Sequence, residues 1–323
     1  MARLAPEKFL YVAASALLLC ACEKAAEPSV NEPTSSTPSS WWKPSPKSSA
    51  PAEIWKEFSG EKAFAHTAKL VEFGPRPSGS AELEKTRAYI IAALKQSGWN
   101  VQLQTFNDET PRGTVAFVNL VARFGDRTDT QRAIVCSHYD TKIFDTIHFV
   151  GASDGGSSTG ALTELARVLA LDPDLAKKTE LVFFDGEEAV TQFTETDGLY
   201  GSRFYARQLR ETKRNTQFKF GILWDMIGDK NLTVTLSPDS PPELARGILD
   251  SASALNLRES FSYYDRDIYD DHVPLNVAHI PTIDLIDFDY PPWHTADDTL
   301  DKLSPESLQK VGAVTLFYLR KHL

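Results

Sequence analysis

Hydrophobic and polar positions repeat with two different periods along the chain from residue 53 to the end. Helical spacing of apolar residues occurs in 60–73, 80–97, 159–171, 199–209, 241–254 and the segment after residue 304. Strand-like segments, alternating or continuously apolar, occupy 101–106, 114–124, 133–137, 180–184, 220–224 and 282–286. Because helices and strands alternate, we predict an α/β fold, a three-layer sandwich around a central mixed, mostly parallel twisted sheet.

Serines at the ends of the periodic segments predict where three of the helices begin. Ser78 or Ser80 precedes the second helix, and Ser304 precedes the last one. Ser157 or Ser158 follows a loop rich in glycine and serine and is expected to open the next helix. A serine hydroxyl at such a position accepts a hydrogen bond from a free N–H of the first turn.

The N-terminus has the pattern of a secretory signal. An apolar run over 9–19 follows basic residues and is shorter than the roughly 20 residues that a membrane-spanning helix needs. The run is followed by Cys20-Ala21-Cys22, which resembles the bacterial lipobox. We therefore expect residues 1–22 to be a lipoprotein signal peptide, with Cys22 carrying the lipid. An ordinary cleaved signal with incidental cysteines is the alternative.

Residues 23–52 are rich in proline, serine, threonine and alanine. Such a segment cannot bury enough apolar surface to order itself, so we predict a disordered tether in front of a folded domain over 53–323. A lipid on Cys22 would attach the chain to a membrane. We expect an exported bacterial lipoprotein on the periplasmic side of the inner or outer membrane, with a monomeric domain.

Composition narrows the classes of partner. The chain has 323 residues, of which 42% are hydrophobic, and this is enough for one large core. The net charge is −10 and no long basic run occurs, so we expect no nucleic-acid partner.

After the tether, Cys136 is the only cysteine. It lies within a predicted strand, where we expect it to pack in the core rather than act as a nucleophile.

Two adjacent carboxylates follow the predicted strand over 180–184. The turn-prone pair Asp185-Gly186 ends this strand, and Glu187-Glu188 come next. Active sites of open α/β folds lie along the carboxyl edge of the sheet, which is where we expect these glutamates. Because adjacent side chains point in different directions, one glutamate can hold a metal while the other transfers protons.

Imidazole and carboxylate side chains also follow the other strands. The full set is His138, Asp154, Glu188, Asp225 and His294. These residue types suit zinc at a catalytic site, where three protein ligands leave a position for substrate or water. Glu187 would then carry protons beside the metal. Asp140 is expected either to support a neighbouring ligand through a hydrogen bond or to cap a turn.

These residues resemble the zinc aminopeptidase and glutaminyl cyclase superfamily, whose aminopeptidases bind two zinc ions through this set. Several stretches are more similar to the animal-type glutaminyl cyclases, which close N-terminal glutamine into pyroglutamate. They are residues 138–142, 183–189, 199–203, 270–274 and 293–295. The loop over 189–198 and the position of Trp293 directly before His294 are also cyclase features.

The cyclase resemblance implies one zinc and a substrate with N-terminal glutamine, a peptide or a protein, which loses ammonia. The residues that it assigns to the zinc are Asp154, Glu188 and His294. It implies Glu187 as general acid and base, and Asp225 and Asp270 as the groups that hold the substrate nitrogens. Trp293 is implied as an apolar wall of the substrate pocket.

Two positions depart from the animal cyclases. Asp284 stands where those enzymes have a histidine, and Phe193 where they have a tryptophan. Because aspartate can still accept a hydrogen bond, we expect Asp284 to keep the catalytic network with Asp270, with a shared proton. The phenyl ring of Phe193 keeps the apolar wall but lacks the indole donor.

Two other functions are compatible with the same residues. A two-zinc aminopeptidase would use His138 and Asp225 as ligands of a second metal and would hydrolyse N-terminal residues. The loop over 189–198 and Trp293 argue against it. A non-catalytic binding or scaffold module would usually have lost a ligand or the base, and this chain retains them all.

Overall fold

The computed structural model describes residues 50–125 and 132–323. The predicted signal peptide over 1–22, the lipidation site Cys22 and the tether up to residue 49 lie outside the described residues. The first element of the described part is the short 3-10 helix η1 (Ile54–Glu57), close to the predicted start of the domain at residue 53. No helix within these residues has the length and apolar character that crossing a bilayer requires.

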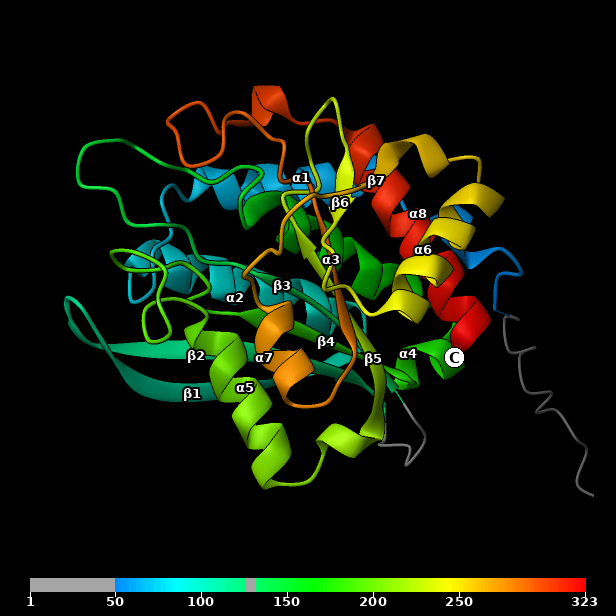
Figure 1. Cartoon of the computed structure of the whole chain (residues 1–323), viewed down its shortest axis with the longest axis horizontal. Helices are drawn as coiled ribbons and strands as arrows, with labels where there is room; N and C mark the ends of the chain where they lie inside the picture. The colour runs from blue at the N-terminus through cyan, green and yellow to red at the C-terminus, as the bar shows by residue number, and fades with distance from the viewer. Residues whose placement is uncertain (1–49, 126–131) are drawn as a thin grey trace, which may run out of the picture. The chain divides into compact units, whose positions relative to one another are not determined.

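The described residues form an eight-stranded mixed sheet (Figure 1). Its strands are β1 (Trp99–Thr110), β2 (Gly113–Phe124), β3 (Arg132–His138), β4 (Thr179–Phe184), β5 (Phe218–Asp225), β6 (Val234–Leu236), β7 (Phe261–Tyr263) and β8 (Thr282–Ile286). They lie in the order β1-β2-β4-β3-β5-β8-β6-β7. The central run β4-β3-β5-β8 is parallel, whereas β2 and β6 join it in antiparallel fashion. The parallel centre brings the carboxyl ends of four strands to one edge.

Helices cover both faces of this sheet (Figure 1). One face carries α1 (Gly60–Glu72), α2 (Ala81–Gln96), α3 (Gly156–Leu169), α4 (Pro173–Lys177), α6 (Pro242–Ala254) and α8 (Pro305–His322). The other face carries α5 (Tyr200–Glu211) and α7 (His272–Val277). Strand β3 shows the alternation, because Ala133 and Val135 pack in the first core while Ile134 and Cys136 pack in the second.

The predicted three-layer α/β sandwich is confirmed, and each predicted strand is present. The sequence analysis missed β6 and β7, because strands of three residues show too little of a period to be recognised. Two of the predicted caps are also confirmed. Ser80 Oγ accepts a hydrogen bond from the backbone N–H of Leu83, and Ser304 Oγ accepts one from Glu306.

The predicted serine start of α3 is wrong. The helix begins at Gly156, and its cap is Gly155, which has a φ of 70° and no side chain to bond. A Cβ on Gly155 would lie 2.7 Å from the carbonyl oxygen of Asp140 and 2.8 Å from Cε1 of His138. The close approach of this loop to His138 therefore selects glycine over a capping serine.

Gly160 allows α3 to pack closely against α1. A Cβ at this position would lie 2.2 Å from Thr67 Oγ1 and 2.7 Å from the Thr67 backbone nitrogen. We therefore expect Gly160→Ala to lower the free energy of unfolding by about 1–3 kcal/mol in urea titrations, since overpacking forces the two helices apart. Ala65→Val, on the exposed side of α1, is the control and should change it by less than about 1 kcal/mol. Equal stability of Gly160→Ala and the wild type would contradict the prediction.

Candidate active site

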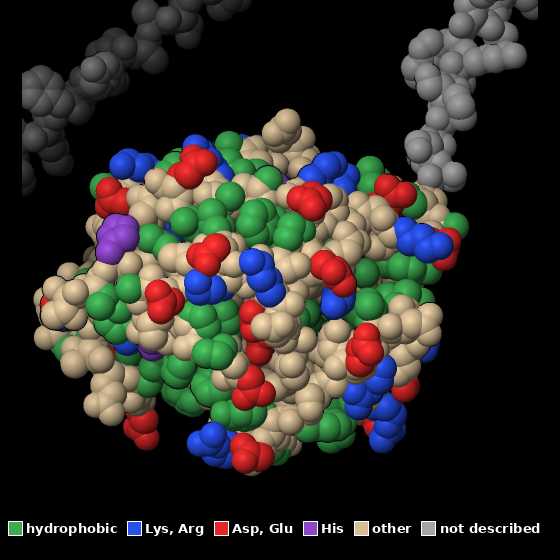
Figure 2. Space-filling model, turned by 90° about the horizontal axis from the view of Figure 1, so that it is seen from above, with side chains coloured by type: hydrophobic (Ala, Val, Ile, Leu, Met, Phe, Trp, Pro, Cys, Tyr) green, Lys and Arg blue, Asp and Glu red, His purple; other side chains and the backbone are tan. Residues whose placement is uncertain are grey.

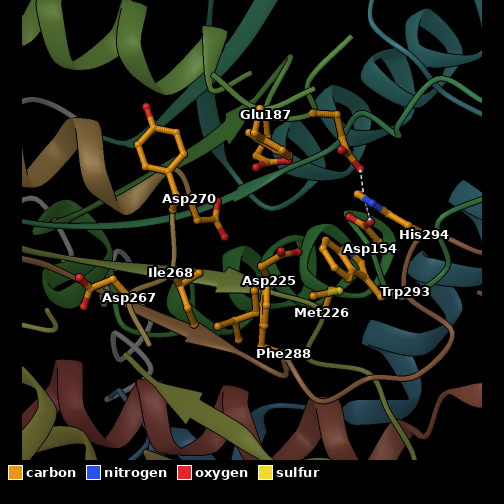
Figure 3. A pocket seen from close by; sticks show the side chains of 14 residues that line it. Asp154, Glu187, Asp225, Met226, Asp267, Ile268, Asp270, Phe288, Trp293 and His294 are labelled. Atoms are coloured by element: carbon orange, nitrogen blue, oxygen red, sulfur yellow. Dashed lines mark hydrogen bonds and ion pairs between the residues drawn. The ribbon is translucent and has the colours of Figure 1, made fainter. Parts of the chain in front are cut away.

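The predicted metal ligands converge at the carboxyl edge of the central strands, and Figure 3 shows Asp154, Asp225 and His294 among them. They come from different elements: His138 ends β3, Asp154 lies in the loop before α3, Glu188 follows β4, Asp225 ends β5, and His294 lies in the loop after β8. Parallel strands deliver their last residues to the same edge, so residues far apart in sequence meet there.

Asp154 lies between two histidines. Its Oδ1 is 3.3 Å from His138 Nε2, and its Oδ2 is 3.3 Å from His294 Nε2. His138 Nε2 also lies 3.2 Å from Asp225 Oδ1, and His294 Nε2 lies 3.3 Å from Glu188 Oε1. Within each group of three residues, the ligand atoms lie within 4.8 Å of one another. The site thus contains two candidate metal groups that share Asp154.

The group of Asp154, Glu188 and His294 has the donors that zinc prefers, an imidazole nitrogen and carboxylate oxygens. Asp154 Oδ2 and Glu188 Oε2 are buried and form no hydrogen bond. The nearby Lys142 Nζ lies 3.6 Å from Glu188 Oε2, which is too long for one. Burying carboxylate oxygens without hydrogen bonds is costly unless a cation compensates their charge, so these residues fit a zinc ion.

The cationic side chains that face these carboxylates are the two histidines and Lys142. Burial acts to lower the pKa of His294, but Asp154 and Glu188 outweigh it and raise that pKa to about 9. Burial and the charge of Asp154 raise the pKa of Glu188 to about 7. A divalent cation bound here would displace the proton of the histidine and would compensate the carboxylate charge in its place.

Glu187, the expected proton carrier, is buried beside the metal ligands and lines the same pocket. Burial and the neighbouring charge of Asp270 raise the pKa of its carboxyl well above the usual range.

The backbone N–H groups of Glu187 and Glu188 donate to the two carboxylate oxygens of Asp140, at 3.2 Å and 3.3 Å. Asp140 Oδ1 also lies 3.5 Å from His138 Nδ1. Asp140 therefore caps the turn, whereas its contact with His138 is an ion pair without a hydrogen bond.

The turn between β4 and the glutamates has a conformation that its sequence dictates. Gly186 has a φ of 78°, and a Cβ there would lie 2.5 Å from the ring of Phe117. The preceding Asp185 is buried, and its carboxylate accepts hydrogen bonds from the backbone N–H of Val118 at 2.8 Å and from Ser78 Oγ at 2.7 Å. The two bonds tie the turn to β2 and to the segment before α2, which fixes the direction in which the glutamates leave the sheet.

Sequence reasoning missed Asp298, which positions the loop of Asp154. Its carboxylate oxygens accept hydrogen bonds from the backbone N–H groups of Ser153, at 2.8 Å, and Asp154, at 3.1 Å. The hydroxyl of Tyr290 donates a third bond to it at 2.8 Å. Only the long-range contact distinguishes Asp298 from its exposed neighbour Asp297, and no local pattern of the sequence carries that information.

The loop over 189–198 is organised by Asp197. Its carboxylate accepts hydrogen bonds from the backbone N–H groups of Val190, Thr191 and Gln192, at 2.7–3.0 Å. This arrangement presents Phe193 to the pocket. Asp197 gave no signal in the sequence, although the loop itself was predicted.

The candidate metal group faces a pocket of about 220 Å³ (Figure 3). Trp293 and Phe193, the predicted apolar walls, both line it. The Trp293 ring stacks on the His294 ring, with 4.2 Å between the centroids. The sequence analysis missed the other apolar residues of the lining, which are Met226, Ile268, Tyr269, Ile286 and Phe288. Most of them belong to irregular loops, where no period distinguishes a pocket residue.

Two residues of the site have a strained backbone. His294 has a φ of 56° and Met226, directly after Asp225, has a φ of 46°. Residues other than glycine rarely adopt this left-handed region, and such strain concentrates at functional sites. The first turn is at His294 itself and the second directly follows Asp225, and both of these polar residues line the pocket.

Asp270 and Asp284 do not form the expected network. Asp270 lines the pocket, but both carboxylate oxygens of Asp284 lack a hydrogen-bond partner within the described part of the chain. Asp284 Oδ2 instead lies 3.8 Å from Nδ1 of His272, a residue that the sequence analysis did not single out for the site. Burial and the charge of Asp270 raise the pKa of Asp284 well above its usual range. No hydrogen bond joins the two aspartates in this structure, and the proton that they are expected to share stays a prediction.

Comparisons with known proteins identify the family. The model of "Peptidase family M28" matches residues 119–319, which is more than half of the chain. A glutaminyl-peptide cyclotransferase of Dictyostelium discoideum is 30% identical over 308 residues, covering 80% of this chain and 84% of the relative. The crystal structure of an Acidobacteriales bacterium glutaminyl cyclase has a TM-score of 0.76 and 30% identity, covering 87% of this chain and 98% of the other.

A peptidase structure is also similar. The Zn-dependent exopeptidase from Parabacteroides distasonis has a TM-score of 0.73 and 26% identity, and the match covers 81% of this chain and 98% of the other. The fold alone therefore does not separate a cyclase from a peptidase, whereas the sequence match over 80% of this chain favours the cyclase. The chain belongs to peptidase family M28 and, within it, to the glutaminyl-peptide cyclotransferases.

Proposed function

We propose that this chain converts the N-terminal glutamine of peptides or proteins into pyroglutamate and releases ammonia. The observation that carries the proposal is a small pocket in which Glu187 lies beside the group of Asp154, Glu188 and His294. The names of the relatives and of the similar bacterial structure support it. An acid–base residue, a metal group and apolar walls in one confined pocket suit an intramolecular acyl transfer.

One zinc would be held by Asp154, Glu188 and His294. Bound there, it would supply Lewis acidity toward the γ-carboxamide oxygen of the substrate. These three residues all line the pocket, whereas His138 does not. His138 is paired with Asp225 at 3.2 Å, and we propose that this pair stays hydrogen-bonded and holds no second metal.

The residues of the chain would carry out the proton transfers. The neutral α-amine of the substrate attacks the γ-carbon, and Glu187 accepts the proton that the amine loses. The bond between the γ-carbon and the amide nitrogen then breaks, and Glu187 returns the proton so that ammonia leaves. A buried carboxyl whose pKa is raised above its usual range can perform both steps. The attacking amine is tethered to its electrophile, so no water is needed and proximity lowers the barrier.

Other pocket residues would orient the substrate. Asp225 and Asp270 both line the pocket and can accept hydrogen bonds from the amine and the leaving nitrogen. Trp293 and Phe193 would hold the aliphatic part of the glutamine side chain and exclude water. Asp284 is buried and lies outside this lining, so we propose that it acts on the site only through the charges of its neighbours.

A two-zinc aminopeptidase is the second candidate, and one observation favours it. His138, Asp154 and Asp225 form a complete second group of ligands, with Asp154 common to both groups. The loop over 189–198, which presents Phe193 to the pocket, favours the cyclase. The two candidates differ in the substrate they consume.

We also propose that the chain is an exported bacterial lipoprotein, anchored through Cys22 on the periplasmic side of a membrane. The support is the sequence pattern of residues 1–22 and the Pro/Ser-rich tether that follows. The monomeric state stays a prediction as well.

The direct test of the activity compares two peptides. The purified chain loaded with zinc should remove one ammonia from Gln-Phe-Ala-amide and leave Leu-Phe-Ala-amide intact, as followed by mass spectrometry. Tethering of the amine to the γ-carboxamide makes cyclisation possible for the first peptide only. Release of free leucine from the second peptide would establish the aminopeptidase instead, and no change in either peptide would favour a non-catalytic module.

Glu187→Gln should remove the proton carrier without removing the metal ligands. We expect kcat for the Gln peptide to fall by about 10²–10⁴-fold, because glutamine cannot accept the amine proton. Zinc content, measured by mass spectrometry of the metal, should stay unchanged. Glu195→Gln, in the exposed part of the neighbouring loop, is the matched control and should keep the wild-type rate. A Glu187→Gln variant with wild-type kcat would exclude Glu187 as the general base.

A further inference from the structure

A second groove lies next to the active-site pocket, between α5 and α7, which lie side by side on one face of the sheet (Figure 1). It has a volume of about 240 Å³. Its lining consists of Arg203, Ala206, Arg207 and Arg210 on α5, together with Tyr269, Val273, Pro274 and Val277 from α7 and the loop before it. The groove combines guanidinium groups on one side with apolar side chains on the other, and none of the residues proposed for the reaction lines it.

The groove concentrates positive charge, because three arginines and no acidic residue line it, although Glu211 lines a neighbouring hollow together with Arg207 and Arg210. Arg203, Arg207 and Arg210 are spaced by four and three residues, which places them on one side of α5. Among the described residues, no carboxylate forms an ion pair with any of the three. Glu211, the next acid along the helix, accepts a hydrogen bond from Gln208 instead. In a chain with a net charge of −10, this groove is a local cationic site suited to an anionic ligand.

The two outer arginines are free to bind a ligand. Arg207 and Arg210 are exposed, and the guanidinium of Arg207 lies 5.1 Å from the ring of Phe204. Arg203 is only partly exposed, and its guanidinium donates hydrogen bonds to the backbone carbonyls of Glu195 and Thr196. Arg203 therefore connects the groove to the loop that forms one wall of the active site.

The groove adjoins the active-site pocket. Tyr269 lines both cavities, and it is half exposed. Asp270 in the pocket and Val273 in the groove are one turn apart, joined by a hydrogen bond of 2.9 Å between the Val273 N–H and the Asp270 carbonyl. One helical turn advances about 5 Å, and an extended peptide advances about 3.3 Å per residue. A peptide with its first residue in the pocket therefore reaches the groove roughly two to four residues later.

We propose that this groove binds acidic side chains of the substrate downstream of its N-terminal glutamine, so that acidic peptides are the preferred substrate class. The inference rests on the proposed cyclase function. A guanidinium fork matches the geometry of a carboxylate, and the exposed Val277 gives the aliphatic part of a glutamate side chain an apolar surface. Because the groove lies away from the reacting atoms, its contacts strengthen binding and lower KM while kcat stays the same.

The test uses two peptides that differ only in charge. Gln-Ala-Glu-Glu-Glu-Ala-amide is compared with Gln-Ala-Gln-Gln-Gln-Ala-amide in steady-state kinetics of the zinc-loaded chain. We expect kcat/KM to be about three- to tenfold higher for the acidic peptide, through a lower KM. The advantage should shrink at high salt, because exposed charges are screened.

Paired variants assign the effect to the groove. The double variant Arg207→Gln/Arg210→Gln should lose the preference for the acidic peptide and keep wild-type kcat/KM on the neutral one. Arg207→Lys/Arg210→Lys should retain part of it, since the charge stays and only the fork geometry is lost. The control Lys62→Gln/Lys95→Gln changes the net charge equally at exposed positions of α1 and α2, on the other face of the sheet, and should keep the full preference.

The outcomes separate the two proposals. Equal kcat/KM for both peptides, or a preference that persists in Arg207→Gln/Arg210→Gln, overturns the groove proposal while the cyclase activity stands. Failure to cyclise even the neutral peptide overturns the proposed function and the groove proposal with it. Binding of the wild type, but not of the Gln variant, to phosphatidylglycerol vesicles together with equal peptide kinetics would assign the groove to a lipid surface instead.

Discussion

Buried negative charge at the carboxyl edge of the sheet is the constraint on which the rest of the site depends. Asp140, Asp154, Glu187, Glu188, Asp225 and Asp270 are all nearly inaccessible to solvent. Burying so many carboxylates is unfavourable unless hydrogen bonds or cations compensate. Backbone N–H groups supply part of this compensation, because Asp140 accepts from the two glutamates of the turn and Asp298 accepts from the loop of Asp154. The oxygens that face the pocket are left for a cation.

The side chains around the two histidines divide the site into two halves. His138 is enclosed by Asp140, Asp154 and Asp225 and is hydrogen-bonded to Asp225, although its Nδ1 forms no hydrogen bond. The half formed by Asp154, Glu188 and His294 faces the pocket and retains oxygens without hydrogen bonds. A single metal in the second half, with Glu187 beside it, would explain how a cyclase uses the same residues as a two-metal peptidase, and this is the arrangement that we propose. A cyclase and a peptidase can therefore share this fold, because the reaction depends on which carboxylates are free to bind a metal.

Sequence patterns predicted the parts of the molecule that rest on local physics. The α/β alternation, the strand-end position of His138 and Asp225, and the carboxylate turn after β4 follow from periodicity and turn chemistry over a few residues. The start of α3 at Gly156 was not predictable in this way, because it depends on how closely the loop passes His138. Asp298 was not predicted for the same reason, since Ser153 and Asp154, the loop residues that it bonds, are more than 140 residues away. The position of Asp284 beside His272 likewise depends on packing between β8 and α7.

The central claim is that one zinc occupies the pocket-facing half of the site. Anomalous X-ray diffraction at the zinc absorption edge, from crystals of the zinc-loaded protein, tests it most directly. The account predicts one anomalous peak, in contact with Asp154, Glu188 and His294, and His138 still hydrogen-bonded to Asp225. A second peak of similar height about 3.5–4 Å from the first, in contact with His138 and Asp225, would contradict it and would identify the two-metal site of a peptidase.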